Sequence, residues 1–279
     1  SLRSASGSAI CQHDLAAGSM GYFLSAWLDR NFDLPEPQIP DALMGADPEI
    51  AAAELRSRWG LDLRPVESMV HLLESKGVRV FSLSEDTSRL NAYATWLAIV
   101  PMVFLDTFKS AEASRFDAAH ELGHLVLHRD LAESDENEDE ANRFAAAFLM
   151  PRQDIIAHRV YPTLPKLVAA KKRWRVALSA LVRRYKDTGL IGEDRARFLY
   201  IQMSRRGYMK NEPSPIERET SAVWEQVLQE LWRERSGRER IVSEICIPIE
   251  IVSSSTFSGA QFPQASGFGK GEGGLRVVG

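Results

Sequence analysis

RFDAAHELGHLVLH, residues 115–128, holds three of the chain's six histidines. On an α-helix, residues four apart lie on one face about one turn from each other, so His120 and His124 can direct both imidazoles at one ion. Glu121 then lies beside that ion, where its carboxylate can take a proton from a bound water. The stretch therefore has the H-E-x-x-H arrangement, whose physical logic is that of a zinc hydrolase.

The residues around this motif favour a packed helix. Ser114 can cap its start with Asp117 three residues on, a pair similar to a capping box. Ala118, Ala119 and Gly123 are small, and they allow close packing by whichever element supplies a third ligand. We therefore expect a helix that is covered on one side by the rest of the metal site.

His128 shares the helix but lies about 12 Å along its axis from His120. Bonds from zinc to nitrogen are only about 2 Å long, so one ion cannot bind both ends of that span. No glycine between His124 and His128 would let the chain fold back. We expect His128 to support a ligand or to lie at the C-terminal end of the helix, where a cation is favoured.

The third ligand must come from another element, and an acidic stretch follows the motif. AESDENEDEANRFAAAFLMP, residues 132–151, predicts a helix and also explains its own charge, because acidic residues are favourable at a helix N-terminus. Its position and spacing do not single out one carboxylate. The acidic residues that it offers are Glu133, Asp135, Glu136, Glu138, Asp139 and Glu140.

RFDAAHELGHLVLH followed by EDEANRFAAAFLMP closely resembles the ImmA/IrrE metallopeptidases of bacteria and their prophages. The resemblance extends from about residue 51 to 213 and includes LRSRWGL, PMVFLD and KKRWRVALSALVRR. It implies that Glu138 is the third metal ligand, with Glu136 and Glu140 as alternatives. Asn142 lies one turn later on the same face, where its amide can donate a hydrogen bond to the ligand carboxylate.

The resemblance also implies an activity. One Zn²⁺ per chain suits two imidazoles and a carboxylate, and Mn²⁺ or Fe²⁺ is an alternative. Glu121 would act as general base, and the predicted reaction is site-specific cleavage of a helix-turn-helix repressor that controls phage, mobile-element or stress genes. The alternative is a regulatory protein that binds a repressor or DNA without cutting it. Candidates for the donor that stabilises the oxyanion are His128, Tyr93 and Tyr161, each expected more often in a structural role.

The predicted fold class is α+β. A zincin-like core with a small antiparallel sheet, the metal helix and the ligand helix precedes a mainly helical basic domain. The pattern predicts helices over 15–28, 48–60 and 65–77, strands over 78–83, 91–98 and 101–106, and then the two site helices. His71 fits the apolar pattern of its helix, and we expect it in the core rather than at a metal. The predicted divisions are 1–48 (helix and proline-rich connector), 49–163 (metallopeptidase), 164–212 (basic, helix-turn-helix-like), 213–252 (helix and edge strand) and 253–279 (disordered tail).

Composition limits the possible partners. The 279 residues carry a net charge of −4, which predicts no global attraction to nucleic acid or acidic membranes. The longest uncharged run near the N-terminus has 14 residues, fewer than the roughly 20 needed to span a bilayer, and two distant cysteines fit the cytoplasm. Residues 166–210 nevertheless hold 13 Lys and Arg against three acidic residues. Contact of this segment with DNA or a partner is a weaker prediction than a solvated basic face, and its candidate residues are Lys171, Lys172, Arg173, Arg175, Arg183 and Arg184.

Overall fold

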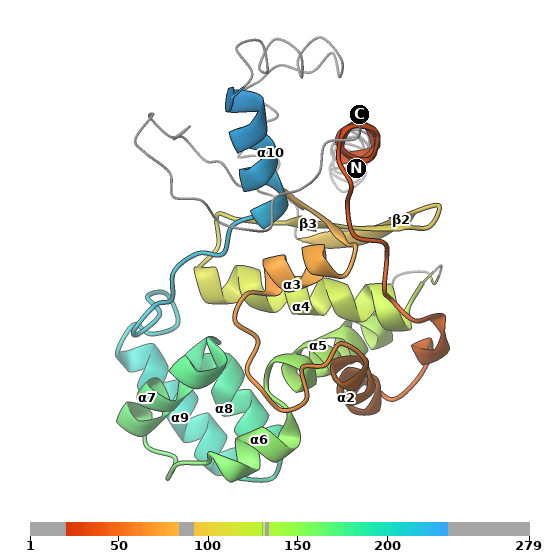
Figure 1. Ribbon diagram of the computed structural model, residues 1–279. Helices are drawn as coiled ribbons and strands as arrows, with labels where there is room; N and C mark the ends of the chain where they lie inside the picture. Colours follow the sequence, from red (N-terminus) through yellow and green to blue (C-terminus); the bar gives the residue numbers. More distant parts are fainter. Residues whose placement is uncertain (1–20, 84–91, 130, 132–133, 234–279) are drawn as a thin grey trace, which may run out of the picture. The chain divides into compact units, whose positions relative to one another are not determined.

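The structure is a computed structural model that describes residues 21–83, 92–129, 131 and 134–233. Helices and one small sheet make the described chain an α+β protein, as predicted (Figure 1). The chain forms two compact units that interleave in sequence. We call Ser1–Gln38, Val70–Phe108 and Thr220–Gly279 the sheet unit, and Ile39–Met69 with Lys109–Glu219 the helical unit. The domain boundaries drawn from the sequence stay a prediction.

The sheet has the strand order β1-β3-β2 and is mixed rather than antiparallel. β2 (Tyr93–Leu97) and β3 (Val100–Leu105) form an antiparallel hairpin, while β1 (Arg79–Ser82) pairs with β3 in parallel. The all-antiparallel prediction was wrong because it paired strands that are consecutive in sequence. Only two residues join β2 to β3, whereas the longer connection from β1 to β3 permits the parallel arrangement. The edge strand predicted over 244–252 lies outside the described residues.

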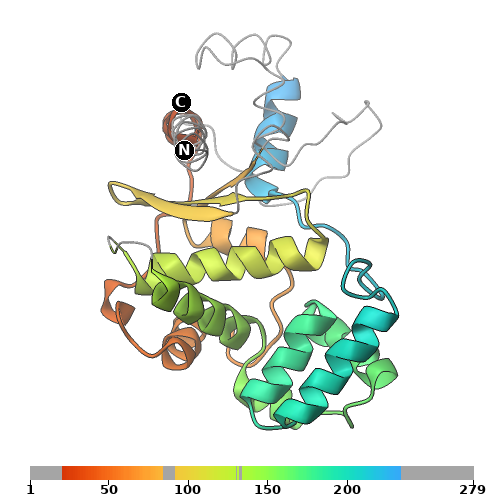
Figure 2. The same cartoon turned by 180° about the vertical axis from the view of Figure 1, so that it is seen from behind.

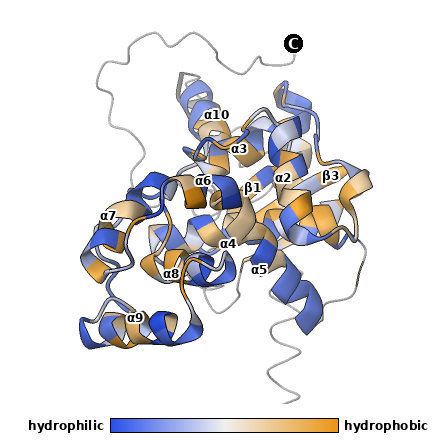
Figure 3. Ribbon diagram, turned by 90° about the horizontal axis from the view of Figure 1, so that it is seen from below, coloured by the Kyte–Doolittle hydropathy of each residue, from blue (hydrophilic) through white to orange (hydrophobic). Residues whose placement is uncertain are grey.

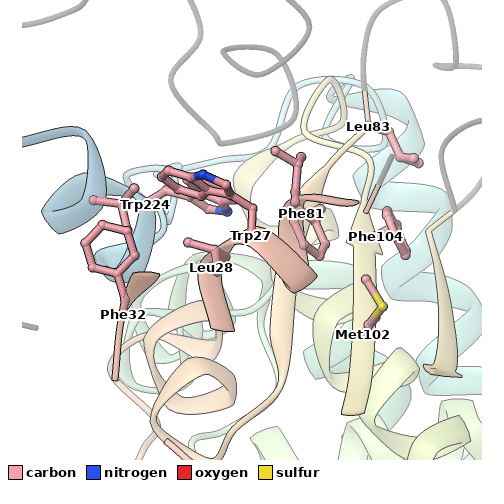
Figure 4. Packing of buried hydrophobic residues seen from close by; sticks show 10 residues of the cluster. Trp27, Leu28, Phe32, Phe81, Leu83, Met102, Phe104 and Trp224 are labelled. Atoms are coloured by element: carbon pink, nitrogen blue, oxygen red, sulfur yellow. The ribbon is translucent and has the colours of Figure 1, made fainter. Parts of the chain in front are cut away.

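An aromatic core fills the sheet unit. Leu24, Trp27 and Leu28 recur at helical spacing in the helix over residues 21–31 and are almost fully buried. They pack with side chains of β1, β3 and α10 (Ala222–Arg233) (Figure 4). The described part of the predicted 15–28 helix is therefore a core helix, and the part before residue 21 lies outside the described residues. The strand and α10 members of this core are Phe81, Met102, Phe104, Trp224 and Val227.

A buried carboxylate holds the start of α10. Glu74 of α3 (Met69–Ser75) accepts the Ser221 hydroxyl and the backbone N–H groups of Ala222 (2.9 Å) and Val223 (3.3 Å). Burial raises the pKa of Glu74. The helix predicted over 65–77 is shorter than expected, and the prediction that His71 packs in the core was wrong, because its side chain is exposed.

The two longest helices of the helical unit, over Ala111–Leu127 and Asp135–Leu149, carry the site, and the elements follow the predicted order. The helix predicted over 48–60 is confirmed: its Asp47 side chain caps the backbone N–H groups of Glu49 and Ile50, and Gly60 follows with a positive φ of 68°. α4 and α5 lie side by side and α2 packs against α5 (Figure 2). The elements are η1 (Asp41–Leu43), α2 (Pro48–Arg58), α4 (Ala111–Leu127), α5 (Asp135–Leu149), α6 (Arg152–Ala157), α7 (Leu164–Trp174), α8 (Leu178–Asp187) and α9 (Glu193–Arg205).

Buried charges fix the first turns of α4. Glu112 is 1% exposed and accepts the Lys171 ammonium (2.9 Å) and the Ile216 backbone N–H (3.1 Å). Arg115, one turn later, pairs with Glu219. Because a buried charge is tolerated only when it is paired, these contacts hold α4 in one position relative to α7 and to the segment that follows α9. Among the described residues, no helix is both long and apolar enough to cross a membrane.

Asp154 gives the helical unit a predicted acid sensitivity. It is 3% exposed and accepts bonds from Arg173 (2.8 and 3.0 Å) and Trp174 (2.6 Å). Burial alone would raise the pKa of this carboxyl, but those hydrogen bonds outweigh burial and lower it. The stabilisation is therefore present above the unfolded value near 3.8 and is lost as pH falls through the lower folded pKa. Urea unfolding at steps from about pH 5 to pH 2 should show a steeper loss of stability for wild type than for Asp154→Asn. Parallel losses would contradict this assignment.

Candidate metal centre

α4 presents the histidine pair on one face. The helix begins one turn earlier than predicted, because Ser110, not Ser114, caps it by accepting the Ala113 N–H (3.2 Å). Ser114 lies inside the helix and is buried, so its predicted capping role was wrong. Two serines, Ser110 and Ser114, lie just before the motif, and sequence alone does not decide which of them keeps extended backbone angles and caps the helix. The later part of α4, with His120 and His124, is helical as predicted.

α5 approaches this face at a glycine. Its start is capped by Ser134, whose hydroxyl accepts the Asn137 N–H (3.1 Å). A Cβ built on Gly123 would lie 3.2 Å from the Ala141 Cα, so the two helices are in close backbone contact there. This confirms the predicted close packing at a small residue. The contact sets Glu138, in the first turn of α5, opposite the histidine pair.

Three ligand groups converge on one point. The Nε2 atoms of His120 and His124 are 3.0 Å apart, and the two oxygens of Glu138 face them, with Oε2 3.3 Å from His120 Nε2 and Oε1 3.2 Å from His124 Nε2. Ligand atoms about 2.0–2.2 Å from a tetrahedral zinc ion lie about 3.3–3.6 Å apart. The separations within this ligand triangle of His120, His124 and Glu138 are therefore close to those between the ligand groups of a tetrahedral zinc site. Among the described residues, this is the one group of His, Cys, Asp and Glu side chains with the spacing of a metal site.

Both histidines are held in the form that binds a metal. Burial, followed by the neighbouring His120, lowers the pKa of His124 to about 4. Burial also lowers the pKa of His120, against the opposing effect of the Glu138 and Asp117 carboxylates. Neutral imidazoles have a free lone pair at neutral pH, as metal coordination requires.

Asn142 acts on a histidine rather than on the carboxylate. Its Oδ1 lies 3.2 Å from His120 Nδ1, so the imidazole donates to the amide oxygen. This bond leaves His120 Nε2 unprotonated and directed toward Glu138, as is usual for metal-ligating histidines. The expected hydrogen bond from the Asn142 amide to the Glu138 carboxylate is not found among the described contacts. One turn of helix brings Asn142 near the site, but the tilt between α4 and α5 decides which ligand it contacts.

His128 is the C-terminal cap residue of α4 and contacts His124 on the side of the ring that faces away from the ligand triangle. Its backbone N–H bonds to the His124 carbonyl (3.0 Å), and its φ of −124° leaves the helical region. Its Nδ1 is 3.1 Å from His124 Nδ1, and its Nε2 is 2.9 Å from the Glu140 carboxylate. Both ring nitrogens are thus engaged, which removes His128 from the candidate oxyanion donors.

Glu121 follows His120 directly and is 5% exposed. Its position at the metal-binding turn fits the predicted general base, and that role stays a prediction. The candidate oxyanion donors differ in environment: Tyr93 stacks on Phe104 in the sheet unit (4.6 Å between ring centroids), and Tyr161 is exposed beside Lys166. The role of either tyrosine stays a prediction.

Two of the six cations predicted for DNA or partner contact are buried. Lys171 pairs with Glu112 and Glu212, and Arg184 pairs with Glu49, so neither guanidinium nor ammonium is free for a phosphate. Including them was wrong, because sequence shows the charge of a residue but not its long-range partner. Arg173 is exposed but pairs with Asp154, and Arg175 is half-buried at the end of α7. Lys172 and Arg183 are exposed, on helices where hydrophilic and hydrophobic residues are interspersed (Figure 3).

Sequence reasoning missed a charged pair beside the site. Asp117 lies one turn before His120 and Glu121 on α4 and binds Lys109 (2.9 Å). The carboxylate raises the pKa of His120, partly offsetting the effect of burial. The i and i+3 spacing from Asp117 to His120 was the available signal, but it also fitted the capping role that we assigned to Asp117.

Gly123→Val should separate the ligands. The closest atoms to a new side chain are the backbone of Ala141 and the ring of Phe144, at 3.2–3.3 Å, so the extra methyl groups must push α5 away. We expect zinc affinity to fall about 10-fold or more and metal-free stability to fall by about 1–3 kcal/mol from overpacking. Chelator competition and urea unfolding measure the two effects. Gly192→Val is the control, because open space surrounds Gly192, and equal effects of both variants would contradict the packing argument.

Residues 73–186 match the model of a protein family described as Peptidase M78, IrrE N-terminal-like domain. The matched range begins in α3, ends in α8 and contains all three candidate ligands. A comparison with curated proteins gave no match.

Proposed function

We propose that this protein is a zinc-dependent endopeptidase of the ImmA/IrrE type, because residues 73–186 match the model of the IrrE N-terminal-like peptidase domain. The observation that carries the proposal is the triangle of His120, His124 and Glu138, with Glu121 next to the first ligand. Two imidazoles and one carboxylate leave a fourth tetrahedral position open, which is typical of catalytic rather than structural zinc sites. Manganese or iron could occupy the same ligand set in a cell.

The chemistry divides between the ion and the protein. When bound, zinc lowers the pKa of water and polarises the scissile carbonyl. Glu121 accepts one proton of the attacking water on its carboxylate, and the water oxygen bonds to the carbonyl carbon. The peptide C–N bond then breaks, and Glu121 returns its proton to the leaving amine nitrogen. His120 and His124 hold the site in place and transfer no proton.

The proposed substrate is a helix-turn-helix repressor in the cytoplasm, cut at one site so that it releases its operator. This part rests on the sequence resemblance, whereas the hydrolytic chemistry rests on the ligand triangle. The competing proposal is a non-proteolytic, zinc-containing regulatory protein that binds a repressor or DNA without cutting it. Presence of a buried carboxylate next to His120 supports the enzyme, because a structural site needs no base.

The test is cleavage of a defined repressor. Zinc-loaded protein is incubated with a small helix-turn-helix protein from the same genome, starting with one from a neighbouring gene where such a gene is present, and the products are read by mass spectrometry. We expect one cut, which a zinc chelator stops and added zinc restores. An unrelated helix-turn-helix protein serves as the specificity control. Release of the repressor from its operator with the repressor still intact would favour the regulator and overturn the peptidase.

DNA contact is a secondary proposal, now confined to exposed cations such as Lys172 and Arg183. Each phosphate neutralised makes the logarithm of the binding constant fall with salt with a slope of about −0.9. A Lys172→Ala, Arg183→Ala double variant should reduce both affinity and slope in a filter-binding titration. Unchanged salt dependence would remove this surface from consideration.

A further inference from the structure

Within the helical unit, three side chains form a line of contacts that starts at a metal ligand: His124, His128 and Glu140. His124 directs Nε2 at the ligand triangle, and its other ring nitrogen, Nδ1, lies 3.1 Å from His128 Nδ1. His128 Nε2 in turn lies 2.9 Å from Glu140 Oε2. The His128 side chain is 4% exposed and Glu140 is 31% exposed, so the imidazole is buried and the carboxylate is partly accessible to water.

The donors and acceptors of this chain allow one arrangement when a metal is bound. A metal on His124 Nε2 requires that nitrogen to be unprotonated, which puts the proton on Nδ1. The Nδ1 of His128 must then accept, so His128 carries its own proton on Nε2. Glu140 is acceptor-only when ionised and receives that proton's hydrogen bond. Each of the three groups has one role, and reversing either imidazole would set two N–H groups or two lone pairs against each other.

We propose that Glu140, acting through His128, is the positioning residue that fixes the tautomer and ring orientation of His124 for metal binding. Glu140 lies two residues after Glu138 on α5, and it engages His128 rather than the ligand triangle. When α5 packs on α4, it therefore places both Glu138, the third ligand, and Glu140, which holds the second ligand His124 through His128. The inference rests on the proposed metal centre and assigns a function to a carboxylate that sequence reasoning left as an alternative ligand.

The first test measures zinc affinity by competition with a chromophoric chelator. We expect His128→Ala and Glu140→Ala each to weaken zinc binding by about 10- to 100-fold, the usual effect of losing a group that orients a ligand. Glu140→Gln should recover much of the loss, because its amide oxygen still accepts from His128. Asp139→Ala is the matched control, since it removes an equally charged, exposed carboxylate next to Glu138 that has no such contact.

Two further measurements separate positioning from general charge or folding effects. In a double variant, Glu140→Ala should add little to His128→Ala, because both residues act along one path. In the wild-type zinc protein, long-range ¹H–¹⁵N spectra should show His124 protonated at Nδ1 and His128 protonated at Nε2 only. Thermal melting of the metal-free variants reports whether they are folded, and the wild-type spectrum needs no variant at all.

The outcomes are distinct. One zinc per wild-type chain, with Glu140→Ala no weaker in binding than Asp139→Ala, or with His128 protonated at Nδ1, overturns the inference and leaves the proposed peptidase intact. Absence of zinc binding by wild type overturns the metal centre and this inference with it. Loss of affinity in Glu140→Ala, recovery in Glu140→Gln and the stated tautomers together establish the positioning role.

Discussion

Glu121→Gln is expected to lower the rate of repressor cleavage by about 10²- to 10⁴-fold, the range that general acid–base catalysis contributes. Glutamine keeps the size of the side chain but cannot accept a proton from the attacking water. Glu121 is not part of the ligand triangle, so the variant should bind zinc about as tightly as wild type. Loss of catalysis with retained metal identifies a base, whereas a carboxylate that only supports the metal site would reduce zinc binding and catalysis together.

The measurement compares single-turnover cleavage and zinc content in the same preparations. Glu136→Gln provides the control, because it removes one exposed carboxylate from the first turn of α5 without touching the ligand triangle. Its rate should stay close to that of wild type. Unchanged cleavage by Glu121→Gln would move the base elsewhere, and loss of zinc would make Glu121 part of the coordination. Equal release of an intact repressor by both proteins would favour the regulatory alternative.

The local parts of this site were accessible from sequence because they depend on helix geometry. Four-residue spacing fixes the face that His120 and His124 share, and rise per residue excludes His128 from the same ion. In the structure, the Nε2 atoms of His120 and His124 are 3.0 Å apart, whereas His128 contacts the other ring nitrogen of His124, Nδ1. Long uninterrupted helices such as α4 and α5 are specified by a pattern that repeats over several turns, so their existence did not depend on tertiary context.

The features that sequence did not predict depend on how helices and strands pack against one another. That packing is not encoded in any short stretch of a single sequence. Asn142 contacts His120 instead of Glu138 because the angle between α4 and α5 selects among partners a few ångströms apart. Lys171 has the same local signature as an exposed cation, and only its contact with Glu112, 59 residues away, makes it a buried ion pair. The parallel pairing of β1 with β3 has the same origin, since strand neighbours are chosen by the connection and not by the strands.

Glu138→Ala should abolish tight zinc binding and leave the metal-free fold nearly unchanged. The side chain is 54% exposed, so its removal leaves no cavity, and it supplies the only carboxylate oxygens of the ligand triangle in the described chain. Loss of a ligand should exceed the roughly 10- to 100-fold effect of losing a group that orients one. The Glu136→Ala and Glu140→Ala variants distinguish the other two carboxylates considered as ligands.

The readout is the stabilisation that zinc gives to each protein. An ion at 100 times its dissociation constant stabilises the native state by about 2.7 kcal/mol, so wild type should melt at a higher temperature when zinc is added. Glu138→Ala should show no such shift at the same zinc concentration, while its metal-free melting temperature matches that of wild type. A retained shift would mean that another carboxylate completes the site. A lowered metal-free melting temperature would mean that Glu138 stabilises the fold itself, which its exposure argues against. Because the two melting temperatures are measured on one sample with and without zinc, the loss of a ligand and the loss of a structural contact cannot be mistaken for each other.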